Sequence, residues 1–255
     1  MAPPVFISRD PLFEKYPTFT PYAYCANNPV KYVDPDGKAV IPTNNLKSNA
    51  SVYAFFSIAE NNSVFRNVMK RFYSNQKTVY IHLSQLMKDG APSGRQNIAR
   101  TEPAEWKLNP VGKYGIERII INSDILDKSG KIAGDWTFIF NSLLHEGLHA
   151  KMFDTRQSDR GYSNHPGYRD FILDRPEDGG HHNQMGVFNR QVLIDGMKEF
   201  DSQMGTSHSD EWYEAISWYG LRETRAWRDF QEANPDTAVR YIKIIQQEIK
   251  KIGAE

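Results

Sequence analysis

The chain has 255 residues, 31 Lys and Arg against 31 Asp and Glu, and 13% aromatic residues. Plentiful aromatics with zero net charge argue against a disordered chain, and the length is typical of one globular domain with a short appendage. The zero charge also excludes the basic excess that nucleic-acid and membrane-surface proteins usually carry. Because Cys25 is the single cysteine, any metal must be held by His, Asp or Glu.

The first 45 residues are expected to form an N-terminal arm. Short runs of tyrosine and valine suit strands there, but they hold too little apolar material for a separate core. We therefore predict a boundary near residue 45, with the functional domain over residues 46–255. Turn-forming dipeptides recur in the arm: Asp10-Pro11, Asn28-Pro29, Asp34-Pro35 and Asp36-Gly37.

The segment after residue 50 begins with helix and continues with strands. Residues 53–72 present an apolar face at helical spacing, with a break at Asn61-Asn62. Residues 78–83 and 116–126 are rich in β-branched side chains and predict two strands. Residues 88–113, which carry several glycines and prolines, are expected to be a loop.

The second half of the chain is predicted to be mostly helical. Asp135 is the expected N-cap of a helix over about 136–152, and residues 154–180 read as a long polar loop. The whole pattern indicates an α+β domain with a small sheet. Three further helices are expected, at about 181–202, 209–230 and 236–252.

The motif His145-Glu146-Gly147-Leu148-His149 lies inside the helix expected at 136–152, in the region that holds six of the seven histidines. Histidines at i and i+4 leave the same helix face, so both rings can bind one zinc ion. Glu146 lies beside the first ligand and can accept a proton from metal-bound water, whose pKa zinc lowers to about 7. The motif therefore predicts a catalytic metal with Glu146 as general base.

A catalytic zinc needs a third protein ligand and one open position. His181 is favoured because it opens a later helix and shares an inward stripe with Met185 and Phe188. His182, rotated by about 100°, is the close alternative.

Other polar residues are weaker candidates. The metzincin extension fails because Met152 and Thr155 occupy its glycine and histidine positions. Glu214 or Glu223 could supply a carboxylate ligand, and Glu223 is also a candidate to hydrogen-bond a ligand histidine, although most helical glutamates are solvated. His82 is interpreted as structural. Four side chains could stabilise an oxyanion, but none is assigned to the site: His165, Tyr168, His208 and Tyr213.

The arm resembles the end of an Rhs-repeat-associated core. The resemblance rests on Asp10-Pro11-Leu12, residues 22–30 and Asp34-Pro35-Asp36-Gly37, the last matching the DPxG element before a C-terminal toxin. It implies that residues 1–45 are the tail of a parent Rhs shell. It also implies a delivered effector that acts in a competitor or host cell, and a cognate immunity protein. Asp10 and Asp34 or Asp36 match a self-cleaving aspartate pair of some members.

The rest of the chain resembles zincin toxins attached to Bacteroidetes-type Rhs proteins. Those proteins join an HExxH helix to a later HHxxM segment, here residues 181–185, and to a W-x-G-L-x-x-T element, here residues 218–224. In SprT-like zincins the third histidine precedes a large apolar residue by four positions, as His181 precedes Met185. The resemblance implies a zincin-like metallopeptidase fold, a protein or peptide substrate and one zinc ion on His145, His149 and His181.

Two functions other than a peptidase stay open. A metal-dependent nuclease toxin is one, because His181-His182-Asn183 is superficially similar to His/Asn nuclease sites, although zero net charge disfavours nucleic acid. A non-enzymatic binding module with a structural zinc is the other, and it requires a fourth protein ligand.

For the peptidase, the strand expected at 117–126 is interpreted as the edge that binds extended substrate. No apolar stretch approaches the ~20 residues of a membrane span.

Overall fold

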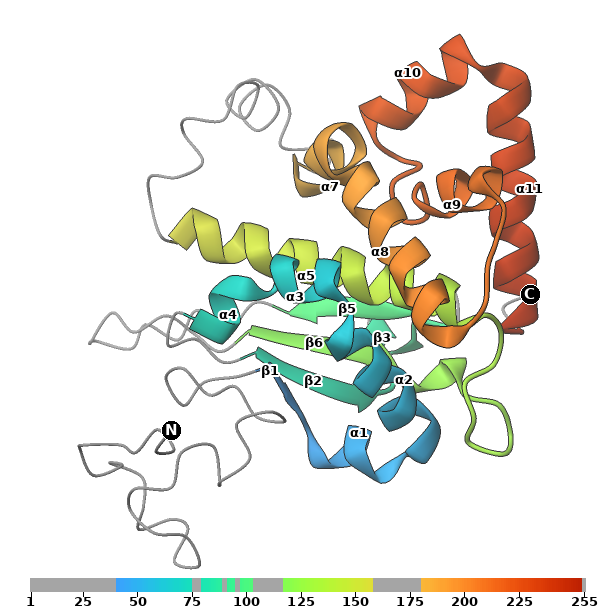
Figure 1. Ribbon diagram of the computed structural model, residues 1–255. Helices are drawn as coiled ribbons and strands as arrows, with labels where there is room; N and C mark the ends of the chain where they lie inside the picture. Colours follow the sequence, from blue (N-terminus) through green and yellow to red (C-terminus); the bar gives the residue numbers. More distant parts are fainter. Residues whose placement is uncertain are drawn as a thin grey trace, which may run out of the picture.

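The computed structural model describes residues 40–74, 79–88, 91–94, 97–102, 117–157 and 180–253. Within these ranges the fold is α+β, with a small sheet and several layers of helix around it (Figure 1). None of the described helices combines the length and apolar character needed to cross a membrane. Several residues singled out above lie outside the described ranges: Asp10, Cys25, Asp34, Asp36, His165 and Tyr168.

The main sheet has four strands in the order β1-β2-β6-β5. β1, β2 and β6 are parallel, and β5 runs antiparallel to β6. Ile81 in β2 pairs with Ile119 in β6, and the β-branched run from Ile119 to Ile121 is buried, as parallel strands usually are. The strands are β1 (Val40–Pro42), β2 (Val79–Ser84), β5 (Ala99–Glu102) and β6 (Glu117–Asn122).

Strand β5, and not β6, forms one edge of the described sheet. β6 lies between β2 and β5, so the prediction that the strand at 117–126 is the edge is wrong. β5 falls in the segment predicted as a loop, because its Ala-Arg-Thr-Glu sequence has little strand character of its own. Its pairing with β6 is nonlocal and determines its conformation.

Strand β1 lies before the boundary that the sequence predicts near residue 45. It pairs with β2, with Val40 opposite Val79, and Val40 is buried in the core. The helix α1 (Asn44–Ser48) follows it directly. The described sheet therefore takes residues from both sides of the predicted boundary.

The first helical layer breaks at Asn62, as the sequence predicts. α2 (Ala50–Asn61) ends there and α3 (Ser63–Val68) begins, followed by α4 (Lys70–Ser74). The Asn62 side chain accepts a hydrogen bond from Phe65 N (2.9 Å) and donates one to Gly196 O (3.0 Å). One buried amide thus caps α3 and fastens it to a helix far along the chain.

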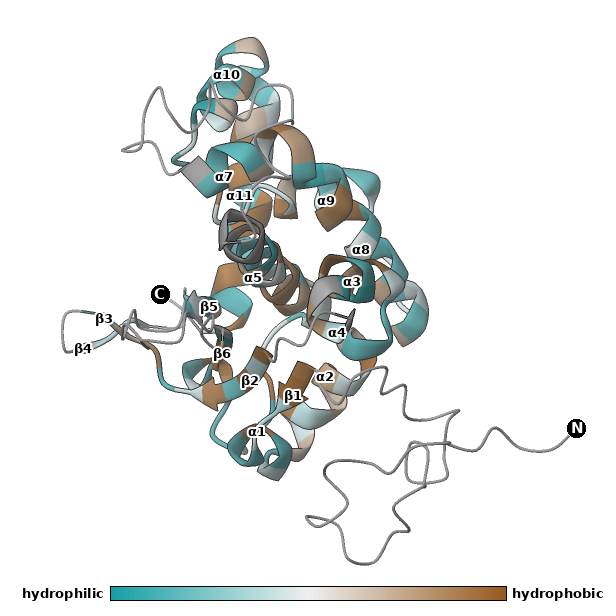
Figure 2. Ribbon diagram, turned by 90° about the vertical axis from the view of Figure 1, so that its left-hand side faces the viewer, coloured by the Kyte–Doolittle hydropathy of each residue, from teal (hydrophilic) through white to brown (hydrophobic). Residues whose placement is uncertain are grey.

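Helix α5 (Trp136–Gln157) is the central element of the fold. Asp135 caps it as predicted, because its carboxylate accepts hydrogen bonds from Thr137 N and Phe138 N at 2.8 and 3.0 Å. α5 packs between the sheet and α8 (Figures 1 and 2). A Cβ on Gly196 of α8 would lie 2.4 Å from Leu144 Cδ2, so the two helices approach closely only because Gly196 has no side chain.

The helices expected after residue 180 are present but interrupted. The first is split by a π-helical turn over Met185–Asn189. The second is split by a turn over residues 217–224, where Trp218 is buried, as are Trp212 and Trp227. The described helices are α7 (Gly180–Gln184), α8 (Arg190–Met204), α9 (Asp210–Ile216), α10 (Arg225–Ala233) and α11 (Pro235–Lys251). A hairpin of β3 (Met87–Lys88) and β4 (Ala91–Pro92) projects beside the sheet (Figure 2).

A polar network around His208 joins the start of α5 to the end of α8. The buried carboxylate of Asp201 accepts hydrogen bonds from Thr137, Tyr213 and His208 Nδ1, the last at 2.7 Å. His208 Nε2 lies 3.2 Å from the Asp135 carboxylate. Burial lowers the pKa of His208, but the hydrogen bonds to Asp135 and Asp201 outweigh this effect and raise the pKa to about 9. His208 and Tyr213 therefore have a structural role.

This network predicts a stability that decreases in alkali. The folded-state pKa of His208 lies above its unfolded value near 6.5, so its contribution is complete below pH 6.5 and is lost as pH rises through about 9. We expect His208→Gln to lower the free energy of unfolding by about 2 kcal/mol at pH 6 and to flatten its decline between pH 6.5 and 9. Urea denaturation from pH 6 to pH 9 measures the free energy of unfolding and its decline with pH, with His82→Gln as control. Parallel pH profiles for wild type and His208→Gln would contradict the assignment.

Candidate metal centre

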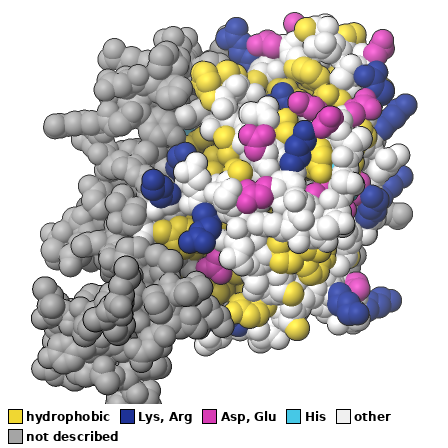
Figure 3. Space-filling view, viewed as in Figure 1, with side chains coloured by type: hydrophobic (Ala, Val, Ile, Leu, Met, Phe, Trp, Pro, Cys, Tyr) yellow, Lys and Arg dark blue, Asp and Glu magenta, His cyan; other side chains and the backbone are white. Residues whose placement is uncertain are grey.

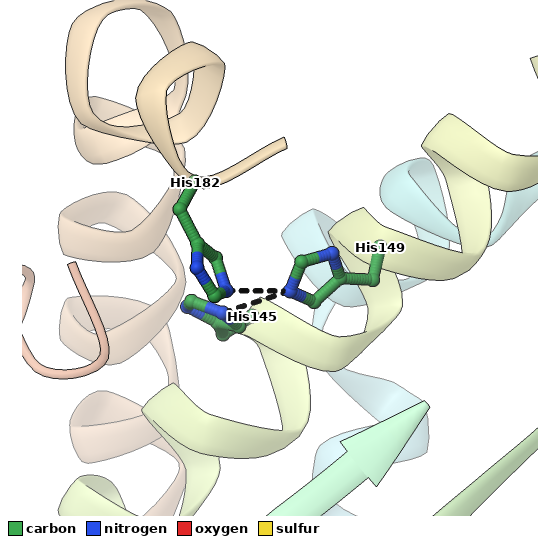
Figure 4. A group of neighbouring side chains, drawn as sticks. All are labelled: His145, His149 and His182. Carbon is green, nitrogen blue, oxygen red and sulfur yellow. Dashed lines mark hydrogen bonds between the residues drawn. The ribbon is translucent and has the colours of Figure 1, made fainter. Parts of the chain in front are cut away.

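Three imidazoles from two helices converge beside the middle of α5. His145 and His149 leave the same face of α5, and His182 points toward them from α7 (Figure 4). The Nε2 atom of His149 lies 3.1 Å from His145 Nε2 and 2.9 Å from His182 Nε2. One nitrogen from each ring lies within 4.8 Å of the other two. Two nitrogens bound tetrahedrally to zinc lie about 3.3 Å apart, so the three rings are spaced to hold a metal ion.

The three rings are in the protonation state that binds metal. Burial, with repulsion from His182, lowers the pKa of His145 to about 3. Burial and the neighbouring histidines also lower the pKa of His149, and burial lowers that of His182. All three are therefore neutral at physiological pH, and a neutral imidazole coordinates a metal through the lone pair of one nitrogen. Three imidazole nitrogens suit zinc, copper, iron or nickel better than calcium or magnesium.

The sequence favoured His181 as the third ligand, but the structure brings His182 into the cluster. His181 contacts the other side of the His149 ring, with the two Nδ1 atoms 3.2 Å apart. In a regular helix, His181, Met185 and Phe188 would share one inward face. The π-helical turn after Gln184 breaks this regularity, and Phe188 is 42% exposed although Met185 is buried.

Glu146 follows His145 in α5, and its side chain contacts the edge strand β5. Its carboxylate accepts a hydrogen bond from Thr101 N at 2.5 Å, and its backbone carbonyl accepts one from Thr101 Oγ1 at 2.8 Å. Burial raises the pKa of the Glu146 carboxyl to about 7, although the hydrogen bonds from Thr101 act in the opposite direction. A carboxyl group with this pKa can accept and release a proton near neutral pH.

The turn over residues 217–224 closes over His145. Gly220 has a φ of +81°, and a Cβ there would lie 3.2 Å from Cε1 of the His145 ring. This close approach is a constraint on the site that the sequence analysis missed. The Trp-x-Gly element at residues 218–220 was the one feature of the sequence that could have indicated this constraint. The residue that Gly220 contacts, His145, lies 75 positions earlier, so a local pattern could not reveal the contact.

The two glutamates considered as ligands lie outside the cluster. The carboxylate of Glu214 forms an ion pair with the guanidinium of Arg190 at 2.5 Å. The same guanidinium donates a hydrogen bond to Ser217 Oγ. Glu223 lies near enough to His182 to oppose the lowering of its pKa, but its side chain is exposed. Among the described residues, the group that could hold a metal consists of the three histidines alone.

Gly220 provides a test of how closely the turn positions His145. Alanine at Gly220 or at Gly205 costs about 1–2 kcal/mol for a left-handed backbone, but a Cβ at Gly205 meets nothing within 4 Å. We expect both variants to lose similar stability, whereas Gly220→Ala alone weakens zinc affinity by about tenfold, because His145 must move. Thermal denaturation and zinc competition titrations measure the two effects. Equal zinc affinities in both variants would show that Gly220 does not control the ligand.

No family model, no curated protein and no solved structure matches this chain. The histidine cluster and the residues that surround it are therefore the observations from which a function is inferred.

Proposed function

We propose that the chain is a zinc-dependent endopeptidase with a zincin-like active site. The observation that carries the proposal is the convergence of His145, His149 and His182 next to Glu146, whose carboxyl contacts the edge strand β5. The proposal is supported by a group of histidines that could hold a metal, a proton acceptor in Glu146 and an edge strand in β5, all adjoining α5. These are the three parts that hydrolysis of an extended peptide requires.

The residues of the site have separate roles in this proposal. His145, His149 and His182 bind zinc, which supplies a Lewis acid that polarises the scissile carbonyl and makes nearby water more acidic. Glu146 accepts the proton of the attacking water and passes it to the leaving amine. Its pKa of about 7 suits both transfers. The hydrogen bond from Thr101 N holds this carboxyl against β5.

The substrate is proposed to lie along β5, which replaces the strand at 117–126 in this role. Thr101 N, the β5 amide directed away from β6, donates to Glu146 on α5, so a bound substrate would have to displace this hydrogen bond. An extended peptide can add to such an edge through main-chain hydrogen bonds. The scissile bond would then pass close to Glu146.

The two alternative functions have less support. A nuclease needs a phosphate-binding basic face, whereas the chain has zero net charge, and the face in Figure 3 carries acidic and basic side chains interspersed. A structural zinc would need a fourth protein ligand, and in the described ranges the cluster contains three histidines. Within the described part of the chain, three ligands leave one position of a tetrahedral zinc for water or substrate.

We also propose that this peptidase is the toxin domain of an Rhs-type effector. The support is the resemblance of residues 10–37 to the end of an Rhs-associated core. Such a toxin would be delivered by its parent shell, act in the target cell, and be neutralised in the producing cell by an immunity protein. Co-expression with the product of a neighbouring open reading frame would test this last expectation.

The peptidase proposal is tested by a search for new protein termini. Zinc-loaded full-length chain is incubated with a denatured proteome, and new amino termini are identified by mass spectrometry, with a chelator-treated sample in parallel. We expect new termini that the chelator abolishes and that added zinc restores. Cleavage of plasmid DNA or RNA without new protein termini would support the nuclease instead and overturn the proposal.

A further inference from the structure

We infer that the two adjacent histidines of α7 have different roles: His182 binds the metal, and His181 is a positioning residue for His149. The inference rests on the proposed zinc site and assigns a residue that the reaction itself does not require. It explains why two consecutive histidines approach one face of α5. Each contacts a different nitrogen of the same ring.

The geometry of His149 carries the inference. Its Nε2 atom faces His145 and His182, at 3.1 and 2.9 Å. Its Nδ1 atom faces Nδ1 of His181 at 3.2 Å, with the ring planes inclined by 35°. The two nitrogens lie on different sides of the imidazole ring, so an ion bound at Nε2 of His149 is remote from Nδ1 of His181. His181 therefore acts through His149.

The chemistry of imidazole then determines where the protons lie. A neutral histidine carries one N–H, and a metal takes the lone pair of the nitrogen that it binds. When Nε2 of His149 binds zinc, its proton must be on Nδ1, and it is donated to the Nδ1 lone pair of His181. The proton of His181 is then on its own Nε2. This hydrogen bond selects one tautomer of His149 and fixes the rotation of its ring.

An imidazole is an unusual acceptor for this purpose. A ligand histidine more often donates its second N–H to a carboxylate, a backbone carbonyl or water. A carboxylate would add a negative charge near the metal, whereas neutral His181 orients the ring without adding one. The zinc ion consequently keeps more of its positive charge, which favours its action as a Lewis acid.

The test separates a positioning residue from a ligand by two substitutions. His181→Leu removes the acceptor, and His181→Asn keeps an acceptor oxygen close to the place of Nδ1. Zinc affinity is measured for the full-length chain by competition with a chromophoric chelator. We expect affinity to fall by about 10–100-fold in His181→Leu and to stay within a few-fold of wild type in His181→Asn. Circular dichroism checks that each variant is folded.

X-ray absorption at the zinc edge gives the second readout, the number of imidazole ligands. We expect three in wild type and in both His181 variants, but two in His182→Leu. Wild-type affinity in His181→Leu, or a loss of one imidazole in that variant, would overturn the inference and leave the proposed zinc site intact. Failure of wild type to bind zinc would overturn the proposed function as well, so the two failures are distinguishable.

Discussion

Replacement of Glu146 by glutamine is expected to lower peptide-bond hydrolysis by about 10²–10⁴-fold while zinc remains bound. Glutamine has nearly the same shape, and its side-chain oxygen can still accept the hydrogen bond from Thr101 N. It cannot accept a proton at neutral pH, so the attacking water loses its base. Initial rates of cleavage, at equal zinc occupancy, measure the effect.

The matched control for this variant is Glu232→Gln. Glu232 is an exposed residue of α10 and lies outside the site, so the substitution makes the same chemical change elsewhere. We expect wild-type rates from it. If Glu146→Gln also cleaved at the wild-type rate with zinc bound, then Glu146 would not be the general base, and another proton acceptor would have to be sought.

Removal of any one cluster histidine is expected to have the second large effect. Alanine at His145, His149 or His182 leaves two protein ligands. Loss of a residue that only supports a ligand lowers metal affinity by up to roughly 100-fold, and loss of a ligand should lower zinc affinity by more than that. Peptidase activity should fall with it. His182→Ala is the most informative variant, because His182 is partly exposed, whereas His145 is 6% exposed and its truncation would leave a cavity.

His82→Ala is the matched control for the ligand series. His82 lies in β2, outside the cluster, and its ring is only partly buried. The control should bind zinc as wild type does, which excludes a general effect of histidine removal. Unchanged zinc affinity in His182→Ala would instead show that α7 does not supply the third ligand.

Local features of the sequence predicted the central helix and its motif well. The Asp135 cap is a contact between near neighbours, and the pair His145 and His149 depends only on helical periodicity. The strand around Ile120 was equally predictable, because three consecutive β-branched residues favour a buried strand. Each of these inferences uses an interaction within a few residues.

The parts that could not be predicted depend on contacts between distant segments. β5 is short and polar, and it is a strand because it pairs with β6 and contacts Glu146. The choice between His181 and His182 depends on how α7 packs against His149 of α5, a contact across more than 30 positions. The role of Gly220 depends on a ring 75 positions earlier in the chain.

We expect His145, His149 and His182 to hold one metal ion with a position open for catalysis. The most direct measurement is zinc-edge X-ray absorption on the full-length chain after loading, combined with metal analysis. We expect one zinc per chain, three imidazole nitrogens at about 2.0–2.1 Å and one further oxygen from solvent. Absence of stoichiometric zinc, or a zinc enclosed by four protein ligands, would contradict this expectation.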